Sequence, residues 1–390
     1  MLHQLKNDFT QIFGSNDGIR AFFAPGRVNL IGEHTDYNGG HVFPCALSLG
    51  TYAIARKRND SIVKMYSKNF ETIGMVEFPL DELVYDSKHD WANYPKGVMK
   101  TFFEHGYFID SGIEVLFYGN IPNGAGLSSS ASIELATAVM LNELFGLQID
   151  MLEMVKMSQE AENKFIGVNC GIMDQFAIGM GKKARAVLLD TQSLNFTYSP
   201  VKLENTSLVI ANTNKRRGLA DSKYNERREE CERALSQLKE KLSIQSLGDL
   251  SIDQFEQNKH FITNETDRKR AKHAVYENQR TIEAVKKLQQ GDIEGFGKLM
   301  NESHISLRDD YEVTGPELDA LVEAAWQQEG VIGSRMTGAG FGGCTISIVR
   351  NDRMQAFIEN VGKKYTEKTG LTADFYVVEI GDGAREIEFE

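Results

Sequence analysis

The 390-residue chain has few cysteines and no long apolar run, and both shortages exclude classes of protein. Its cysteines are isolated, with no Cys-x-x-Cys pair, which argues against a disulfide scaffold and against a zinc site. We expect these thiols to be buried and reduced, in a cytoplasmic protein. No apolar run reaches the length of a membrane span, and the first residues do not have the pattern of a signal peptide. The four cysteines are Cys45, Cys170, Cys231 and Cys344.

Acidic residues outnumber basic ones. The chain has 55 Asp and Glu and 43 Lys and Arg, which gives a formal net charge of -12. This balance argues against nucleic acid or an anionic membrane as the main partner. The length predicts about two domains. Because the pattern of segments changes near residues 195–205, we expect domains at about 1–200 and 201–390.

Strands and helices cluster along the chain instead of alternating, which predicts an α+β fold. The opening segment MLHQLKNDFTQIFG has Leu5, Phe9, Ile12 and Phe13 at helical spacing, which predicts an amphipathic helix that ends at Gly14. Further helices are predicted at about 92–104, 129–146, 150–165 and 352–368, with three or four between 219 and 328. Strands are predicted at 21–25, 51–58, 61–67, 112–119, 184–190 and 207–213, at the segment CTISIVR, and last at ADFYVVEI.

The stretch GRVNLIGEHTDYNGG, from Gly26 to Gly40, places Glu33, His34 and Asp36 within four residues. A surface loop is one explanation for so many charges at one turn. A polar ligand held by several hydrogen bonds is the better one, because carboxylates form strong, charge-assisted hydrogen bonds with hydroxyl groups.

The stretch IPNGAGLSSSAS, from Ile121 to Ser132, follows a predicted strand and opens a predicted helix. Its glycines permit a tight turn, and its hydroxyls and helical N–H groups favour an anion. It is not a P-loop, because the Gly-Lys-Ser/Thr ending is absent. A serine-rich helix cap explains the pattern equally well.

Two acidic residues follow, Glu162 on a predicted helix and Asp174 at a turn or helix start. Taken alone, Glu162 is a solvated helix residue and Asp174 an N-cap. Together with an anion-binding loop, they are the parts of a phosphoryl-transfer site. The later stretch GAGFGG, from Gly338 to Gly343, matches G-x-G-x-x-G but precedes a strand, so a dinucleotide-binding site is rejected. A close backbone approach to a phosphate and a close-packed turn before the strand are the two interpretations left open.

These segments together resemble the GHMP family of small-molecule kinases, and GRVNLIGEHTDYNGG resembles its galactokinase branch. IPNGAGLSSSAS is similar to the family's ATP-phosphate loop and MTGAGFGGC to its third motif, while QEAENKFIGVNCGIMDQFA and LADSKYNERREEC are similar to galactokinase segments. The resemblance implies an N-terminal α/β domain like ribosomal protein S5 domain 2. It also implies a ferredoxin-like α+β C-terminal domain, with the active site in the cleft between them.

The resemblance also implies the activity, which is ATP-dependent phosphorylation of α-D-galactose at its C1 hydroxyl, the first committed step of the Leloir pathway. The implied ligands are galactose and MgATP, and the implied state is a cytoplasmic monomer without an obligate protein partner, nucleic acid or membrane. Asp174 and Arg27 would act at the reacting hydroxyl, with Asp174 orienting it and taking its proton late. Glu33, His34, Thr35, Asp36 and Tyr224 would surround the sugar. Ser67, Gly124, Ala125, Gly126, Leu127, Ser128, Ser129 and Ser130 would bind the nucleotide, and Ser130 and Glu162 would hold Mg²⁺.

Two alternatives remain at this stage. One is a kinase for a modified galactose, which the motifs do not distinguish. The other is a sugar sensor that keeps the fold without catalysis. Such sensors lack the Ser-Ala pair of the phosphate loop, which is intact here as Ser130-Ala131.

Overall fold

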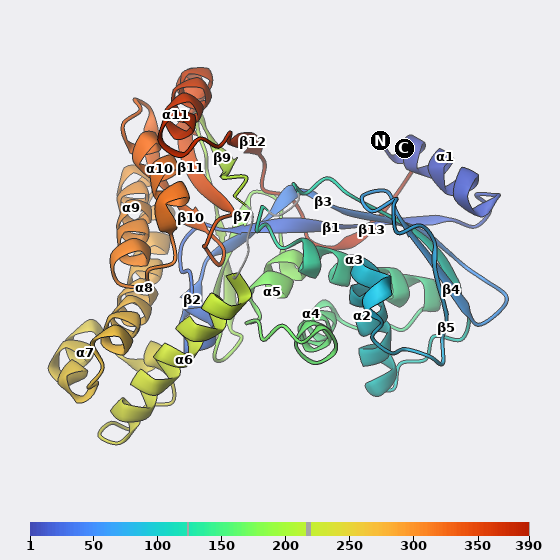
Figure 1. Cartoon of the computed structure of the whole chain (residues 1–390), viewed down its shortest axis with the longest axis horizontal. Helices are drawn as coiled ribbons and strands as arrows, with labels where there is room; N and C mark the ends of the chain where they lie inside the picture. Colours follow the sequence, from blue (N-terminus) through green and yellow to red (C-terminus); the bar gives the residue numbers. More distant parts are fainter. Residues whose placement is uncertain (123–124, 216–219, 390) are drawn as a thin grey trace.

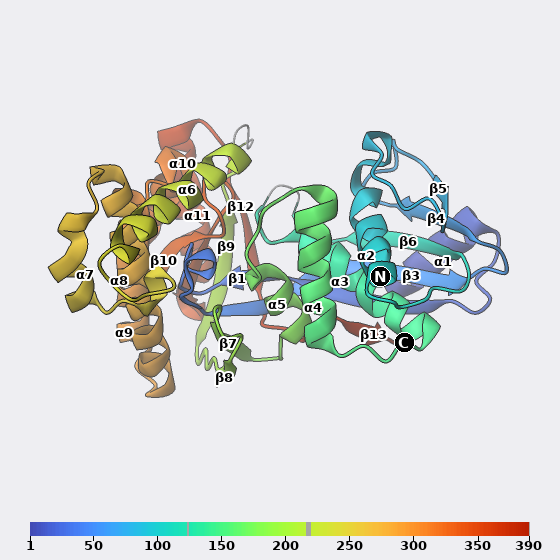
Figure 2. The same ribbon diagram turned by 90° about the horizontal axis from the view of Figure 1, so that it is seen from below.

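The computed structural model describes residues 1–122, 125–215 and 220–389. Figures 1 and 2 show two lobes along the long axis, one built on the first sheet with α1 to α5 and the other on the second sheet with α6 to α11. Within these ranges, none of the helices has the length and apolar character that a membrane span needs.

The first sheet has the strand order β13-β1-β3-β6-β4-β5 in the described residues. Most of its helices pack on one face and bury the largest apolar cluster, while α1 covers the other face with Leu5 and Phe9 against Ile54 and Leu116. The strands are β1 (Arg20–Asn29), β3 (Pro44–Lys57), β4 (Ile62–Ser67), β5 (Val76–Pro79), β6 (Ile113–Gly119) and β13 (Arg385–Ile387). The helices are α1 (Leu2–Phe13), α2 (Asn93–Glu104), α3 (Ser129–Phe145), α4 (Met151–Glu160) and α5 (Met173–Met180).

The second sheet has the order β10-β11-β9-β12 with antiparallel neighbours, which is the 2-3-1-4 arrangement of a ferredoxin-like domain. Its strands alternate apolar residues between two faces, as along β9, where Val209 faces one apolar cluster and Leu208 another. The strands are β9 (Thr206–Asn212), β10 (Val331–Thr337), β11 (Cys344–Arg350) and β12 (Asp374–Val378). The helices of this lobe are α6 (Ala220–Lys239), α7 (Ile252–Asn258), α8 (Glu265–Gln289), α9 (Ile293–Asp309), α10 (Gly315–Trp326) and α11 (Met354–Thr369).

A third, small sheet and a shared apolar cluster join the two lobes. The sheet is formed by β2 (His41–Val42), β7 (Arg185–Asp190) and β8 (Phe196–Pro200). The cluster packs Val28 and Phe43 of the first half against Ile210 and Ile346 of the second. The end of β1 leads into the turn that carries Glu33, His34 and Asp36, called the charged turn below. This part of the chain is therefore held between the lobes.

The α+β class and most predicted segments are confirmed, with three corrections. Five α-helices, α6 to α10, lie in the described part of 219–328, instead of three or four. The segment ADFYVVEI is not the last strand, because β13 follows β12. Cys170 is partly exposed, whereas the other three cysteines are buried as expected.

Candidate active site

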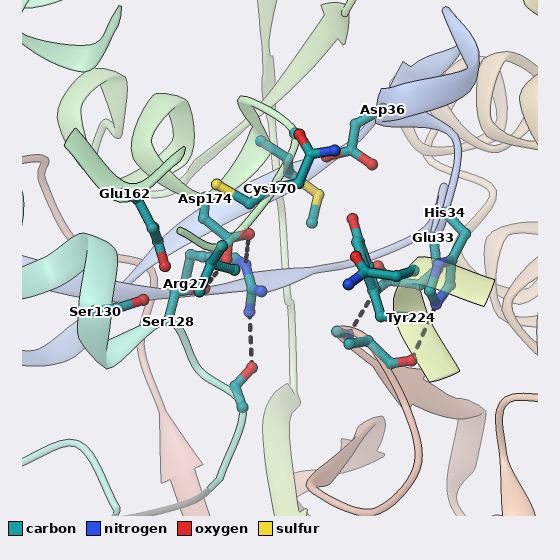
Figure 3. Close-up of a pocket in the computed structure, with 18 of the residues that line it drawn as sticks. Arg27, Glu33, His34, Asp36, Ser128, Ser130, Glu162, Cys170, Asp174 and Tyr224 are labelled. Atoms are coloured by element: carbon teal, nitrogen blue, oxygen red, sulfur yellow. Dashed lines mark hydrogen bonds and ion pairs between the residues drawn. The ribbon is translucent and has the colours of Figure 1, made fainter. Parts of the chain in front are cut away.

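A cavity of about 340 Å³ is lined by residues of five segments. They are the charged turn, the loop before α3 that contains Gly126 and Ser128 (the phosphate-like loop), the stretch before α5, the start of α6, and the loop that begins at Gly338 (the third glycine loop). Figure 3 shows Ser130 and Glu162 at one end, Arg27 and Asp174 in the middle, and Glu33, His34 and Tyr224 at the other end. Segments more than 300 residues apart therefore form one site. The predicted residues that line it are Arg27, Glu33, His34, Asp36, Gly126, Ser128, Ser130, Glu162, Asp174 and Tyr224.

Arg27 lies on β1 just after an irregularity in the pairing of β1 with β3, and its side chain is almost fully buried. Its Nε donates to Oδ1 of Asp174 at 2.8 Å, and one terminal nitrogen donates to the carbonyl of Gly126 at 3.0 Å. Burial acts to lower the pKa of Arg27, but Asp174 and more distant carboxylates outweigh it and raise the pKa. The cavity therefore contains a fixed, permanent positive charge.

Asp174 is the second residue of α5, and both of its carboxylate oxygens accept hydrogen bonds from side chains. Oδ1 accepts from Arg27, and Oδ2 accepts from the Ser128 hydroxyl at 2.6 Å. The carboxylate is partly exposed to the cavity, at 28% of the side chain. Its orientation is thus set from β1 and from the start of α3, and its remaining lone pairs are available to a ligand.

The phosphate-like loop turns sharply before α3. Ser128 has φ 62° and ψ 52°, a left-handed conformation that is costly for a residue with a Cβ atom, and Gly126 also has a positive φ. Ala125 and Leu127 are buried in the cluster between the lobes. Gly124, also predicted to bind the nucleotide, lies outside the described residues. The loop is thus anchored by Ala125 and Leu127, while Gly126, Ser128 and Ser130 line the cavity.

Ser130 and Glu162 both line one end of the cavity. Glu162 belongs to a π-helical turn, Ala161–Ile166, which follows α4, and it is buried instead of solvated. Gln175 Nε2 donates to Glu162 at 2.6 Å and to the buried Glu134 at 3.0 Å. Burial, together with Asp174, raises the pKa of Glu162 to about 7.

Ser130 and Glu162 suit a Mg²⁺ ion that receives most of its ligands from water and from a nucleotide. At this end of the cavity one carboxylate and one hydroxyl are available, and the described residues contain no group of three His, Cys, Asp or Glu side chains able to hold a metal. Mg²⁺ commonly binds through one or two carboxylates together with water and the phosphates of a nucleotide.

The charged turn supplies the other end of the cavity. Glu33 Oε1 accepts from the backbone N–H of Gly338 at 2.9 Å and lies 3.3 Å from the buried Arg335. Burial raises the pKa of Asp36 to about 7, with further contributions from the charges of Asp174 and Glu33. A cluster of carboxylates held close together in this way is typical of a site that binds polar groups.

The remaining predicted sugar residues lie differently. Thr35 is fully buried, does not line the cavity, and donates its hydroxyl to the carbonyls of Gly32 and His41, so it holds the turn. Tyr224, on α6, lines the cavity with its ring 5.5 Å from that of His34.

Ser67, at the end of β4, lines a second cavity of about 130 Å³ with Trp91, Tyr94, Ser129 and other residues. Ser130 lines both cavities, so the second cavity adjoins the end of the first where Ser130 and Glu162 lie. An aromatic recess beside a phosphate-binding loop suits a nucleobase.

Sequence reasoning missed several residues of the site. Cys170, Gly171 and Asn225 line the cavity, and a Cβ atom on Gly171 would lie 1.9 Å from Asp36 Oδ2, so any other residue there would displace the Asp36 carboxylate. The signal for them was their position beside Asp174 and Tyr224 in the sequence. Gly338 and Ala339 also line the cavity, so the third glycine loop is part of the site.

Three family models match the chain: GHMP kinases N terminal domain at residues 93–182, the galactokinase galactose-binding signature at 7–57, and GHMP kinases C terminal at 284–367. The chain is 65% identical to a galactokinase of Fusobacterium nucleatum, with all of both chains covered. It is 61% identical to one of Clostridium beijerinckii, with 99% of each covered.

The fold also matches the crystal structure of Lactococcus lactis galactokinase complexed with galactose. That match has a TM-score of 0.97 and 50% sequence identity, and covers 99% of this chain and 100% of the other. Since the three models agree with relatives that match over the full length, the chain belongs to the galactokinase branch of the GHMP kinase family.

Proposed function

We propose that this chain transfers the γ-phosphoryl group of ATP to the C1 hydroxyl of α-D-galactose, giving galactose 1-phosphate and ADP. The observation that carries the proposal is the Arg27–Asp174 pair, which faces the same cavity as Glu33 and Asp36 of the galactose-binding signature. The Lactococcus lactis relative, which is named as complexed with galactose, supports the choice of sugar.

In this proposal the sugar occupies the end of the cavity with Glu33, Asp36 and Tyr224. A monosaccharide offers only hydroxyls and a ring oxygen, so it is recognised by fixed donors and acceptors. Glu33 is rigidly held by Gly338 and Arg335, and Asp36 packs against the backbone of Gly171. Rigid carboxylates discriminate between sugars that differ in the direction of one hydroxyl.

The C1 hydroxyl would then lie at Asp174. Its oxygen forms a bond to the γ-phosphorus as the bond between that phosphorus and the leaving oxygen of ADP breaks, and its proton passes to Asp174. Phosphoryl transfer has a loose transition state, so an acceptor that takes the proton late is sufficient. Arg27 fixes Asp174 and neutralises charge on the transferring group.

The nucleotide phosphates would lie at Gly126 to Ser130, where the first N–H groups of α3 favour an anion, with the base in the recess lined by Ser67. Mg²⁺ would be held by Ser130 and Glu162, and when bound it neutralises charge on the phosphates.

The domain division near residue 200, the monomeric state and the cytoplasmic location belong to the same proposal. The division is supported by the separate sheets of the two lobes, except that β13 completes the first sheet from the second half of the chain. The cytoplasmic location is supported by the use of ATP and by isolated cysteines. Sedimentation of the purified chain tests the oligomeric state.

The test of function is release of ADP, measured in a coupled assay with galactose, with glucose and without sugar. We expect rapid, Mg²⁺-dependent ADP release with galactose only, and a product with phosphate on C1. A chain that binds galactose but releases no ADP would be a sugar sensor, and preferential use of a modified galactose would identify the other alternative.

A further inference from the structure

Both ring nitrogens of His34 already have partners within the protein. Nε2 lies 3.0 Å from the carbonyl oxygen of Ala339, and Nδ1 lies 2.7 Å from the hydroxyl of Tyr37. A carbonyl oxygen can only accept, so Nε2 carries the proton and Nδ1 accepts from Tyr37. Burial lowers the pKa of His34 to about 3, which agrees with this neutral form. No ring nitrogen of His34 is left over for a sugar hydroxyl.

The hydrogen bonds continue away from the cavity in one direction. Tyr37 gives its proton to His34, so its oxygen accepts from the hydroxyl of Tyr311 at 2.6 Å. The Tyr311 oxygen in turn accepts from the thiol of Cys231, 3.2 Å away. Tyr311 and Cys231 are buried, and neither tyrosine lines the cavity. The Ala339 carbonyl therefore fixes the direction of the whole chain of bonds.

The rings of these residues also pack in a column that ends at the cavity. Centroids are 4.5 Å apart between His273 and Tyr311, 4.8 Å between Tyr311 and His34, and 5.5 Å between His34 and Tyr224. His273 Nε2 lies 3.0 Å from the carbonyl of Glu33, so the column also supports the backbone of the charged turn. Figure 3 shows the two members of the column that line the cavity, His34 and Tyr224, beside Glu33.

We propose that Tyr37 and Tyr311 are positioning residues for the sugar and that they act through His34. In this arrangement His34 forms a wall of the cavity with its ring and does not hydrogen-bond the sugar. Its fixed orientation sets the positions of the Ala339 carbonyl and the Tyr224 ring. The inference rests on the proposed function, since the ligand is galactose.

The first test measures galactose affinity by calorimetry, and steady-state kinetics, for Tyr37→Phe and Tyr311→Phe. Each change leaves a buried polar group without a partner, so galactose affinity should fall about tenfold. The KM for ATP and kcat should change little, because the interaction is the same in the ground and transition states. Tyr276→Phe is the matched control: it also loses a hydroxyl bond, to Glu256, but lies outside the cavity.

The double variant Tyr37→Phe with Tyr311→Phe gives a sharper result. Removing both partners of one bond costs less than the two single changes suggest, so the loss of affinity should be smaller than the product of the two. Independent effects that multiply fully would overturn the coupling of the two hydroxyls.

The second test uses the wild-type chain, so it does not depend on the stability of a variant. ¹⁵N-labelled histidine spectra, with His34 assigned by its loss in His34→Gln, should give a neutral imidazole protonated at Nε2, unchanged by galactose. Protonation at Nδ1, or a shift of Nε2 on addition of galactose that indicates a new hydrogen bond, would overturn the inference. If wild type does not phosphorylate galactose, the proposed function fails instead.

Discussion

Arg27 Nε lies 2.8 Å from Asp174 Oδ1, although 147 positions separate the two residues in the chain. The pair joins β1 to α5, and Ser128 completes it from the start of α3. A carboxylate held by two donors has a fixed direction and is well placed to orient a hydroxyl. The geometry therefore favours alignment of the reacting group.

We expect Asp174→Asn to lower kcat by about 10²–10⁴, the range of a lost acid–base group. Asparagine keeps the shape but removes the charge that orients and accepts the proton. Nucleotide affinity should survive, which fluorescence titration with a nucleotide analogue measures. Asp110→Asn, at an exposed carboxylate, is the control. Near-normal turnover would reduce Asp174 to a structural residue of α5.

Ser128 permits a test that separates its hydroxyl from its backbone. Ser128→Ala and Ser128→Gly both remove the bond to Asp174, so both should lower kcat by a similar factor. Only glycine relieves the left-handed backbone, so Ser128→Gly should be more stable than Ser128→Ala by about 1 kcal/mol in chemical denaturation. Equal stabilities would show that the turn carries little strain.

Glu162→Gln should impair turnover far more than galactose binding, because it removes the one carboxylate proposed for Mg²⁺. The required Mg²⁺ concentration should rise, and calorimetry with galactose alone should be nearly unchanged. Glu160→Gln, two residues earlier at the end of α4 and ion-paired with Lys164, serves as the comparison. An unchanged rate at limiting Mg²⁺ would remove Glu162 from this role.

Asp36→Ala should lose most galactose affinity and narrow the ratio of kcat/KM between galactose and glucose. The two sugars differ only in the direction of the C4 hydroxyl, and a site built to pair that group strongly penalises a sugar whose hydroxyl points elsewhere. The measurement is the ratio for both sugars in wild type and variant. If both sugars weaken equally, Asp36 is a general anchor, and Glu33 or Tyr224 distinguishes the C4 position.

Asp36 also predicts how galactose binding depends on pH. Burial, Asp174 and Glu33 raise its pKa to about 7, so the carboxylate becomes protonated as the pH falls through 7. If the ionised form accepts from the sugar, galactose affinity without nucleotide should fall by up to about tenfold per pH unit below that value. Asp36→Asn should bind weakly with a flat profile. A flat wild-type profile between pH 5.5 and 8.5 would contradict the assignment.

Much of the fold could be predicted because its elements have strong local patterns. The 129–146 segment predicted α3 (Ser129–Phe145) closely, since its helix formers end at Gly146 in a left-handed cap. β10 (Val331–Thr337) was not predicted, because Gly333, Ser334 and Arg335 interrupt any apolar pattern. Ser334 and Arg335 are buried there among partners from distant segments, as Glu33 is for one terminal nitrogen of Arg335.

The residues of the site also divide into those that the sequence could predict and those that it could not. Residues within motifs, such as Glu33 and Asp36, could be named from the sequence. The partners of those residues could not, because no local pattern links Tyr37 to Tyr311, 274 positions away, or Gln175 to Glu134. Such pairs depend on tertiary contacts that only the folded chain reveals.

The pairing of β13 with β1 has a consequence for how the chain is made. Phe22 of β1 lies opposite Glu386, so the first lobe needs residues from the far end of the chain to complete its sheet. During synthesis the edge of β1 stays open until residues 385–387 have been made, and cleavage near residue 200 would leave this lobe without an edge strand. Both termini lie beside this lobe in Figure 1, so a circular permutant that joins them would turn the late pairing into an early, local one.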